Sequence, residues 1–203
     1  MIKAVIFDWS GTLSNNLFAF KQVCDRIFTK FGKKPISLEE IREKFETPYM
    51  KFWNTYLPEL SKEEQDKLYE EAIHEAEEAF LFDGVLEVIQ ELHRKGVQLF
   101  VISSDPYSKL LLEAKEYGIS DFFLELIGGV HEKEYALLSL IKKYDLDRSK
   151  TIFIGDTCGD IRAGKKAGVT TIGISWGFNV KEKLLAAKPD FIFDDIREIK
   201  KLF

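Results

Sequence analysis

Lys3-Ala4-Val5-Ile6-Phe7, followed by Asp8-Trp9-Ser10-Gly11-Thr12-Leu13, is the stretch that decides the fold of this chain. Its first five residues are rich in β-branched and aromatic side chains, which is typical of a strand buried on both faces of a parallel sheet. The run ends at a carboxylate, Asp8, and the working groups of open parallel sheets lie just beyond the carboxyl ends of the strands. Gly11 then allows a sharp turn where a side chain would collide with a bound anion.

A second stretch has the same design: Thr151-Ile152-Phe153-Ile154, then Gly155-Asp156-Thr157-Cys158-Gly159-Asp160. An apolar strand again ends in an acid, Asp156, and Asp160 follows in the first turn of the next helix. Either stretch alone would more often be a helix cap or a turn than a catalytic site. Together they predict carboxylates that face one edge of the sheet.

The remaining sequence alternates between strands and helices. Strands are expected at residues 97–102, 126–127, 170–174 and 191–193, which with right-handed crossovers gives a parallel α/β sheet with helices on both faces. Residues 15–81 show helical spacing only, with capping-box patterns at Ser37 and Ser61, the second opening a long helix through Phe80. We therefore expect a Rossmann-like core from residues 1–14 and 82–203, and an all-helical cap from residues 15–81 inserted after the first strand.

Two further positions complete a family pattern. Ser103 ends the strand at 97–102 and Lys133 stands at a helix start; alone, the first would be a helix cap and the second a solvated side chain. With the two acidic stretches, they resemble the four motifs of the haloacid dehalogenase-like hydrolase superfamily, in order and over nearly the whole chain. The ending, from Gly173 to Phe191, resembles that of phosphoglycolate-phosphatase-like members, whose insertion lies in the same place.

The resemblance implies roles for the acidic residues. Asp8 would be the nucleophile, because a carboxylate that attacks phosphorus forms an aspartyl-phosphate and divides one difficult displacement into two easier ones. Asp8, Asp156, Asp160 and the backbone carbonyl of Ser10 would hold Mg²⁺, which prefers oxygen ligands.

The resemblance also implies how the phosphate is bound. Lys133 would pair with Asp8 and with the transferred phosphoryl group, and would count among the catalytic residues. The Ser103 hydroxyl would donate to the phosphoryl oxygens, and Thr12 with the amides of its turn would complete an anion cradle. The cap would recognise the substrate through a loop at residues 45–51, in which Lys51 is the candidate contact.

Ser10 departs from the family pattern, because phosphatases of the superfamily usually carry a second Asp at this position. That carboxylate protonates the leaving oxygen and then activates water, and general acid–base help of this kind is worth about 10²- to 10⁴-fold. A serine hydroxyl cannot replace it near neutral pH. Substitution by Glu46 or by Asp105 is an open possibility.

Three interpretations remain. The first is a Mg²⁺-dependent phosphatase of small phosphorylated metabolites, slow or acting on leaving groups that need no proton. The second is a phosphonatase, because Asp8-Trp9-Ser10-Gly11-Thr12 resembles the first motif of phosphonoacetaldehyde hydrolases, which form a Schiff base with a cap lysine; Lys51 is the candidate. The third is a phosphate-ester binding or regulatory protein with little turnover. A metal-independent dehalogenase is disfavoured, since Asp156 and Asp160 are kept.

Composition limits the partners. A net charge of −5 without a basic patch argues against nucleic acid and membrane surfaces. No run approaches the roughly 20 apolar residues of a membrane-spanning helix, and no signal peptide is seen, so we expect a cytoplasmic protein. Phe52, Trp53 and Tyr56 could pack inside the cap or form an interface, which leaves both a monomer and a homodimer open.

Overall fold

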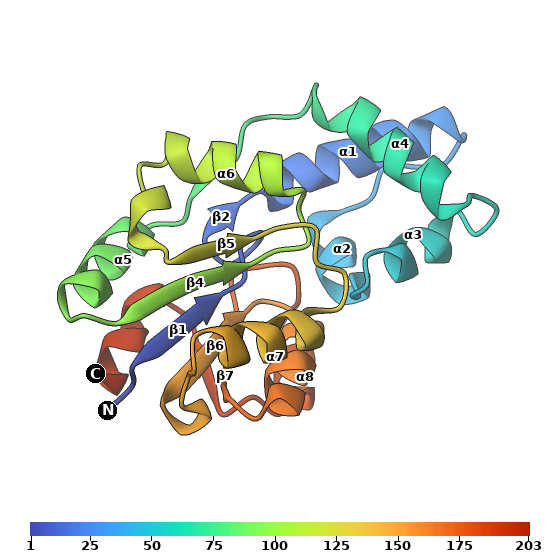
Figure 1. Ribbon diagram of the computed structural model, residues 1–203. Helices are drawn as coiled ribbons and strands as arrows, with labels where there is room; N and C mark the ends of the chain where they lie inside the picture. The colour runs from blue at the N-terminus through green and yellow to red at the C-terminus, as the bar shows by residue number, and fades with distance from the viewer.

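The computed structural model describes all 203 residues and is organised around one six-stranded parallel sheet (Figure 1). The strand order is β5-β4-β1-β6-β7-β8. Strands β4 and β5 lie on one side of β1, and β6, β7 and β8 lie on the other. The strand order therefore reverses at β1, and in such sheets ligands bind at the carboxyl end of the strand where the order reverses. The predicted parallel α/β fold is confirmed. The strands are β1 (Ala4–Phe7), β4 (Gln98–Ile102), β5 (Glu125–Ile127), β6 (Thr151–Gly155), β7 (Thr170–Ile174) and β8 (Phe191–Phe193).

Helices cover both faces of the sheet, because side chains alternate along each strand. Val5 and Phe7 of β1 pack with α5, α6 and the C-terminal turns, whereas Ala4 and Ile6 pack with α7 and α8. None of the helices is both long and apolar enough to cross a membrane. The helices of the core are α5 (Val85–Arg94), α6 (Tyr107–Glu116), α7 (Lys133–Lys143), α8 (Cys158–Ala167) and α9 (Lys181–Ala186), with 3₁₀ turns at Ser120–Phe122, Arg148–Lys150 and Ile196–Leu202.

Residues 15–81 form a helical insertion, which extends to one side of the sheet in Figure 1. A short ribbon closes its base: β2 (Ser14–Asn15) pairs antiparallel with β3 (Phe80–Leu81). This ribbon was not predicted, because two residues are too few to show a strand pattern. The helices of the insertion are α1 (Leu17–Lys30), α2 (Leu38–Lys44), α3 (Met50–Tyr56) and α4 (Lys62–Ile73).

The helical insertion has a hydrophobic cluster of its own. Phe52 and Trp53 are buried within it and Tyr56 packs against it, so these aromatic side chains serve internal packing and do not form an exposed patch. Phe178 is the residue from outside the insertion that joins this cluster; its ring lies 5.3 Å from that of Phe20 and 4.7 Å from that of Phe45. The insertion is therefore packed onto the segment that follows β7.

The prediction of one long helix through Phe80 was wrong, because α4 ends at Ile73. The chain beyond it carries Glu75, Glu77 and Glu78, and negative charge is unfavourable at the carboxyl end of a helix. Side chains of α1 also take up the backbone groups that a longer helix would use. Gln22 accepts from the amide of Glu77 at 2.8 Å, and Arg26 donates to the carbonyl of Glu75 at 2.8 Å.

Polar contacts fasten the end of α2 to the segment after β7. The Arg42 guanidinium donates to the carbonyls of Ser175 and Gly177 at 2.5 and 2.9 Å. In return, the Asn179 side-chain amide donates to the carbonyl of Phe45 at 2.9 Å. These bonds satisfy backbone carbonyls on both sides of the junction.

Candidate active site

Asp8 is the first residue after β1, and its carboxylate is buried between two donors. Its Oδ1 accepts a hydrogen bond from the Trp9 amide at 2.7 Å and lies 2.7 Å from Nζ of Lys133, at the start of α7. The two side chains are only 6 % and 9 % exposed. Since Phe7 of β1 lies opposite Ile154 of β6, the residues that follow β6 are brought beside Asp8.

Asp156 follows β6 and is fully buried. Its Oδ2 accepts a hydrogen bond from the Phe178 amide at 2.6 Å, and its Oδ1 accepts one from the Thr12 hydroxyl at 3.3 Å. A Cβ atom at Gly11 or at Gly177 would lie 2.3 Å from Asp156 Oδ2, and Gly11 also has φ of +75°. The carboxylate can therefore occupy this place only because both neighbours are glycines.

Asp160 lies in the first turn of α8, where a capping box with Thr157 fixes it. The Thr157 amide and hydroxyl donate to Asp160 Oδ2 at 3.0 and 2.6 Å. The other oxygen, Oδ1, lies 2.7 Å from Nζ of Lys133. Lys133 consequently bridges Asp8 and Asp160, and it is a buried partner of both rather than a solvated side chain.

The structure thus gathers Asp8, Asp156 and Asp160 into one buried cluster. One carboxylate oxygen from each lies within 4.8 Å of the others. Burial, reinforced by Asp160 and Asp156, raises the pKa of Asp8 well above its usual range although Lys133 opposes this. Burial and Asp160 likewise raise the pKa of Asp156 to about 6. Burial alone would lower the pKa of Lys133, but Asp160 and Asp8 raise it above its usual value.

This cluster fits a hard divalent cation. It offers oxygen ligands only, and its three carboxylates face one ammonium, so an excess of negative charge is buried. A cation would stabilise the ionised forms that burial disfavours. Asp8, Asp156 and Asp160 are the side chains that could hold it; a contribution from the Ser10 carbonyl stays a prediction.

Ser10 lies on the other side of Asp8, in a hydroxyl-rich part of the site. Its hydroxyl donates to Oδ2 of Asp105 and accepts from Nδ2 of Asn16 at 2.7 Å. The Ser103 hydroxyl donates to the same oxygen of Asp105 at 3.2 Å and accepts from the Asp105 amide at 3.0 Å. One carboxylate oxygen therefore receives the protons of both candidate hydroxyls.

Asp105 begins a row of charged residues at i, i+4 spacing that continues along α6. Lys109 Nζ lies 3.2 Å from Asp105 Oδ1 and 3.3 Å from Glu113 Oε1. Glu113 Oε2 in turn accepts from the Trp9 indole nitrogen at 2.6 Å. Burial would raise the pKa of Asp105, but Lys109 and the Ser10 hydroxyl hold it below its usual value. The Asp105 carboxylate is thus stabilised as an anion.

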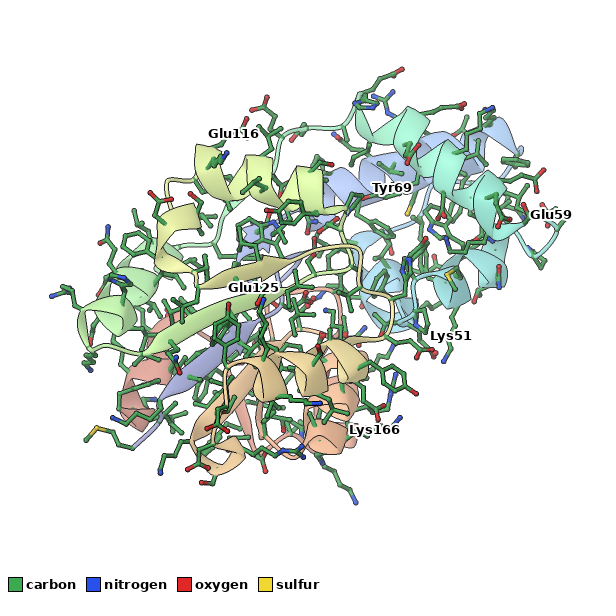
Figure 2. All side chains as sticks on the ribbon, viewed as in Figure 1. Lys51, Glu59, Tyr69, Glu116, Glu125 and Lys166 are labelled. Atoms are coloured by element: carbon green, nitrogen blue, oxygen red, sulfur yellow. The ribbon has the colours of Figure 1, made fainter.

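The remaining predicted phosphate ligands differ in their positions. Ser103 and Thr12 are fully buried near Asp8, and Thr12 faces Asp156. Lys51 lies on the surface of the helical insertion (Figure 2), 58 % exposed, with its Nζ 3.9 Å from Glu46 Oε2. The structure does not bring Lys51 into contact with the buried cluster.

Sequence reasoning missed Asn16, the amide of Phe178, and the row-forming partners Lys109 and Glu113. Asp105 itself was named as a possible substitute acid, but its role as acceptor of the Ser10 and Ser103 hydroxyls was not foreseen. Asn16 and Phe178 had no signal in the sequence, since one belongs to the turn that leads into the helical insertion and the other acts through its backbone.

The fold and the geometry of the site agree with those expected from the proteins to which this chain is similar. A family model described as haloacid dehalogenase-like hydrolase matches residues 5–174. The chain belongs to this family. Among the relatives of this haloacid dehalogenase-like hydrolase are phosphoglycolate phosphatases of Vibrio parahaemolyticus, 28 % identical over 98 % of this chain and 94 % of the relative, and of Vibrio cholerae, 28 % identical over 96 % and 94 %. A haloacid dehalogenase-like family hydrolase from Streptococcus pneumoniae superimposes with a TM-score of 0.87 at 25 % identity, covering 100 % of this chain and 98 % of that one.

Three of the predicted site residues follow adjacent strands of this haloacid dehalogenase-like hydrolase. Ser103 follows β4, Asp8 follows β1 and Asp156 follows β6, and these strands are neighbours in the sheet. Their common edge explains how residues more than 140 positions apart in the sequence share one site.

Proposed function

We propose that this hydrolase is a Mg²⁺-dependent phosphatase of small phosphorylated metabolites that works through an aspartyl-phosphate on Asp8. The observation that carries the proposal is the buried cluster, in which Asp8 lies 2.7 Å from Lys133 and within reach of two further carboxylates. Relatives that are named phosphoglycolate phosphatases support this reaction class. Which metabolite is hydrolysed depends on the helical insertion.

Asp8 and Lys133 would carry the chemical step. A free oxygen of Asp8 attacks phosphorus, while the Lys133 ammonium holds that carboxylate in place and offsets charge on the phosphoryl group. When bound by Asp8, Asp156, Asp160 and the Ser10 carbonyl, the ion would neutralise charge between nucleophile and substrate. The hydroxyls of Ser103 and Thr12, which donate to Asp105 and Asp156 in this structure, would have to turn away from these acceptors to bind the phosphoryl oxygens.

We further propose that residues 15–81 act as a cap over a core of residues 1–14 and 82–203. The insertion has its own hydrophobic cluster and meets the core through Arg42, Asn179 and Phe178. Such a cap would exclude water during transfer and open for release. Lys51 would contact the substrate only if the cap closed further.

The phosphonatase alternative has less support from the geometry. It requires a cap lysine beside Asp8, whereas Lys51 is exposed and faces Glu46. Borohydride trapping with phosphonoacetaldehyde, lost in Lys51→Ala, would favour it. The binding-protein alternative predicts thermal stabilisation by phosphate esters without turnover.

The test is phosphate release from p-nitrophenyl phosphate with and without Mg²⁺, for the wild type and Asp8→Asn. We expect metal-dependent release that falls by at least about 10⁴-fold in the variant, because the nucleophile is lost. Asp121→Asn, at an exposed position in a 3₁₀ turn, is the matched control and should retain activity. Absence of release from the wild type at high enzyme concentration would contradict the proposal.

A further inference from the structure

Ser10 has no proton to offer to a leaving group. A serine hydroxyl carries one proton and two acceptor positions. The proton of Ser10 is donated to Asp105, and one acceptor position takes the Asn16 amide at 2.7 Å. Donation to a substrate oxygen would break a hydrogen bond to a charged acceptor, which is about twice as strong as one between neutral groups.

Asp105 cannot take over this role in its observed contacts. Its Oδ2 accepts from two hydroxyls, those of Ser10 and Ser103, and its Oδ1 faces the Lys109 ammonium at 3.2 Å. Both oxygens therefore face donors, so this carboxylate accepts and does not donate. Glu46, the other candidate, is 55 % exposed and faces Lys51.

The residues proposed for phosphoryl transfer are all present. Asp8 can attack phosphorus. Lys133 can offset the negative charge of the phosphoryl group, and the acidic cluster can bind a cation that does the same. A site that transfers phosphoryl groups but does not protonate leaving groups discriminates among substrates by the stability of the departing anion.

We infer that this hydrolase prefers phosphates whose leaving group departs as a stable oxyanion, such as acyl phosphates, phosphoanhydrides and aryl phosphates, over alkyl monoesters. The inference rests on the proposed function and names the substrate class for the same site.

The chemistry balances without a protein acid. In the first step a bond forms between Asp8 and phosphorus, the bond to the leaving oxygen breaks, and its electron pair departs with the carboxylate, phosphate or phenolate. In the second step water attacks phosphorus, the bond to Asp8 breaks, and its electron pair restores the carboxylate. Both protons of that water end on the released phosphate, as H₂PO₄⁻.

The decisive experiment compares p-nitrophenyl, phenyl and benzyl phosphates, which have leaving groups of similar size. The quantity is kcat/KM, since it reports the steps up to formation of the aspartyl-phosphate. We expect a fall at each replacement, with benzyl phosphate at least about 10²-fold below p-nitrophenyl phosphate. Acetyl phosphate should likewise exceed ethyl phosphate. Equal values across the series would overturn the inference.

Ser10→Asp, with Ser10→Asn as the matched control, distinguishes the effect of an added acid from the effect of a larger side chain at position 10. The aspartate should raise kcat/KM for benzyl phosphate by about 10-fold or more and change it little for p-nitrophenyl phosphate, whereas the asparagine should not. A gain with both variants would contradict the inference. If Ser10→Asp does not fold beside Asp105, the wild-type series still decides.

Failure of this inference is distinguishable from failure of the proposed function. Absence of metal-dependent release from p-nitrophenyl phosphate would refute the phosphatase itself. Release that depends on Asp8 but not on the leaving group would refute only the substrate preference.

Discussion

Two lysines in this hydrolase each lie between two carboxylates, and their surroundings differ. Lys133, on α7, bridges Asp8 and Asp160, whereas Lys109, on α6, bridges Asp105 and Glu113. The two helices pack on opposite faces of the sheet (Figure 1). Around Lys133 a third acid leaves negative charge in excess, which suits a cation. Around Lys109 the carboxylates are occupied by Ser10, Ser103 and Trp9.

The difference teaches that the charged cluster around Lys133 and the hydroxyl-rich part around Asp105 are separate parts of the proposed site. The charged side comprises Lys133 and the acids that follow β1 and β6, and one carboxylate oxygen from each acid lies within 4.8 Å of the others. On the hydroxyl side, which comprises Ser10, Ser103 and Asp105, both hydroxyls already donate their protons to Asp105. A change on one side should therefore have effects that the other side does not share.

The largest expected effect is that of Lys133→Met. Removing this ammonium leaves Asp8 and Asp160 buried without a counter-charge, and breaking one partner of a buried pair costs about 3–5 kcal/mol. We expect a loss of that size in the free energy of unfolding, measured in urea without metal. Lys166→Met is the control, because Lys166 is 64 % exposed in its pair with Glu134, and such pairs contribute about 0–1 kcal/mol. Equal losses in the two variants would show that burial of the pairs of Lys133 does not make them more important for stability than an exposed pair.

A smaller effect follows from the pKa of Asp156, which burial and Asp160 raise from 3.8 to about 6. Between these values the folded protein binds more protons than the unfolded chain, so this group makes the metal-free protein more stable as pH falls through 6. Asp156→Asn should therefore stabilise the metal-free protein by about 1–3 kcal/mol at pH 7 and by less at pH 5.

The same carboxylate should control the response to metal. Thermal stabilisation of the wild type by Mg²⁺ should diminish as pH falls below about 6, since the ligand must be ionised. In Asp156→Asn this stabilisation should be lost at every pH. A metal response that survives in the variant would remove Asp156 from the proposed ligands.

The smallest expected effect is that of Lys109→Met. This side chain is 27 % exposed, three times as much as that of Lys133, and Asp105 and Glu113 keep their hydrogen bonds from Ser10, Ser103 and Trp9 when the ammonium is removed. We expect a loss of about 1 kcal/mol in the free energy of unfolding, and no change in the stabilisation by Mg²⁺. A loss as large as that of Lys133→Met would make the two sides equivalent and weaken the comparison.

The sequence predicts those parts of the molecule that depend on local patterns. Buried strands that end in Asp8 and Asp156 are visible as apolar runs, and neighbouring parallel strands bring their ends together. The helix at Ser61 has a capping box, which the structure confirms, yet its end at Ile73 depends on contacts with Gln22 and Arg26. Such contacts join segments far apart in the chain, so the local spacing of apolar residues cannot predict them.

The same distinction applies to the site. Residue type and order are enough to expect Asp8, Asp156 and Asp160 near one another, because each follows or begins a core element, whereas the place of Lys133 beside them was implied only by the family resemblance. The sequence left open whether Glu46 or Asp105 substitutes for the missing acid, and it did not indicate a hydrogen-bond partner for Ser10. The pairing of β4 with β1 brings the segment after β4, which carries Asp105, against the Ser10 hydroxyl.

The space around Asp156 also bears on how the sequence can vary among relatives. Gly11 has a left-handed backbone, so its identity is required by the turn as well as by space. Gly177 does not; its Cβ is excluded by the Asp156 side chain, 2.3 Å away. The same Cβ would also lie 2.3 Å from Asp156 Cβ and 2.5 Å from the Gly11 carbonyl oxygen, so loss of the acid alone would not make room for a side chain at position 177.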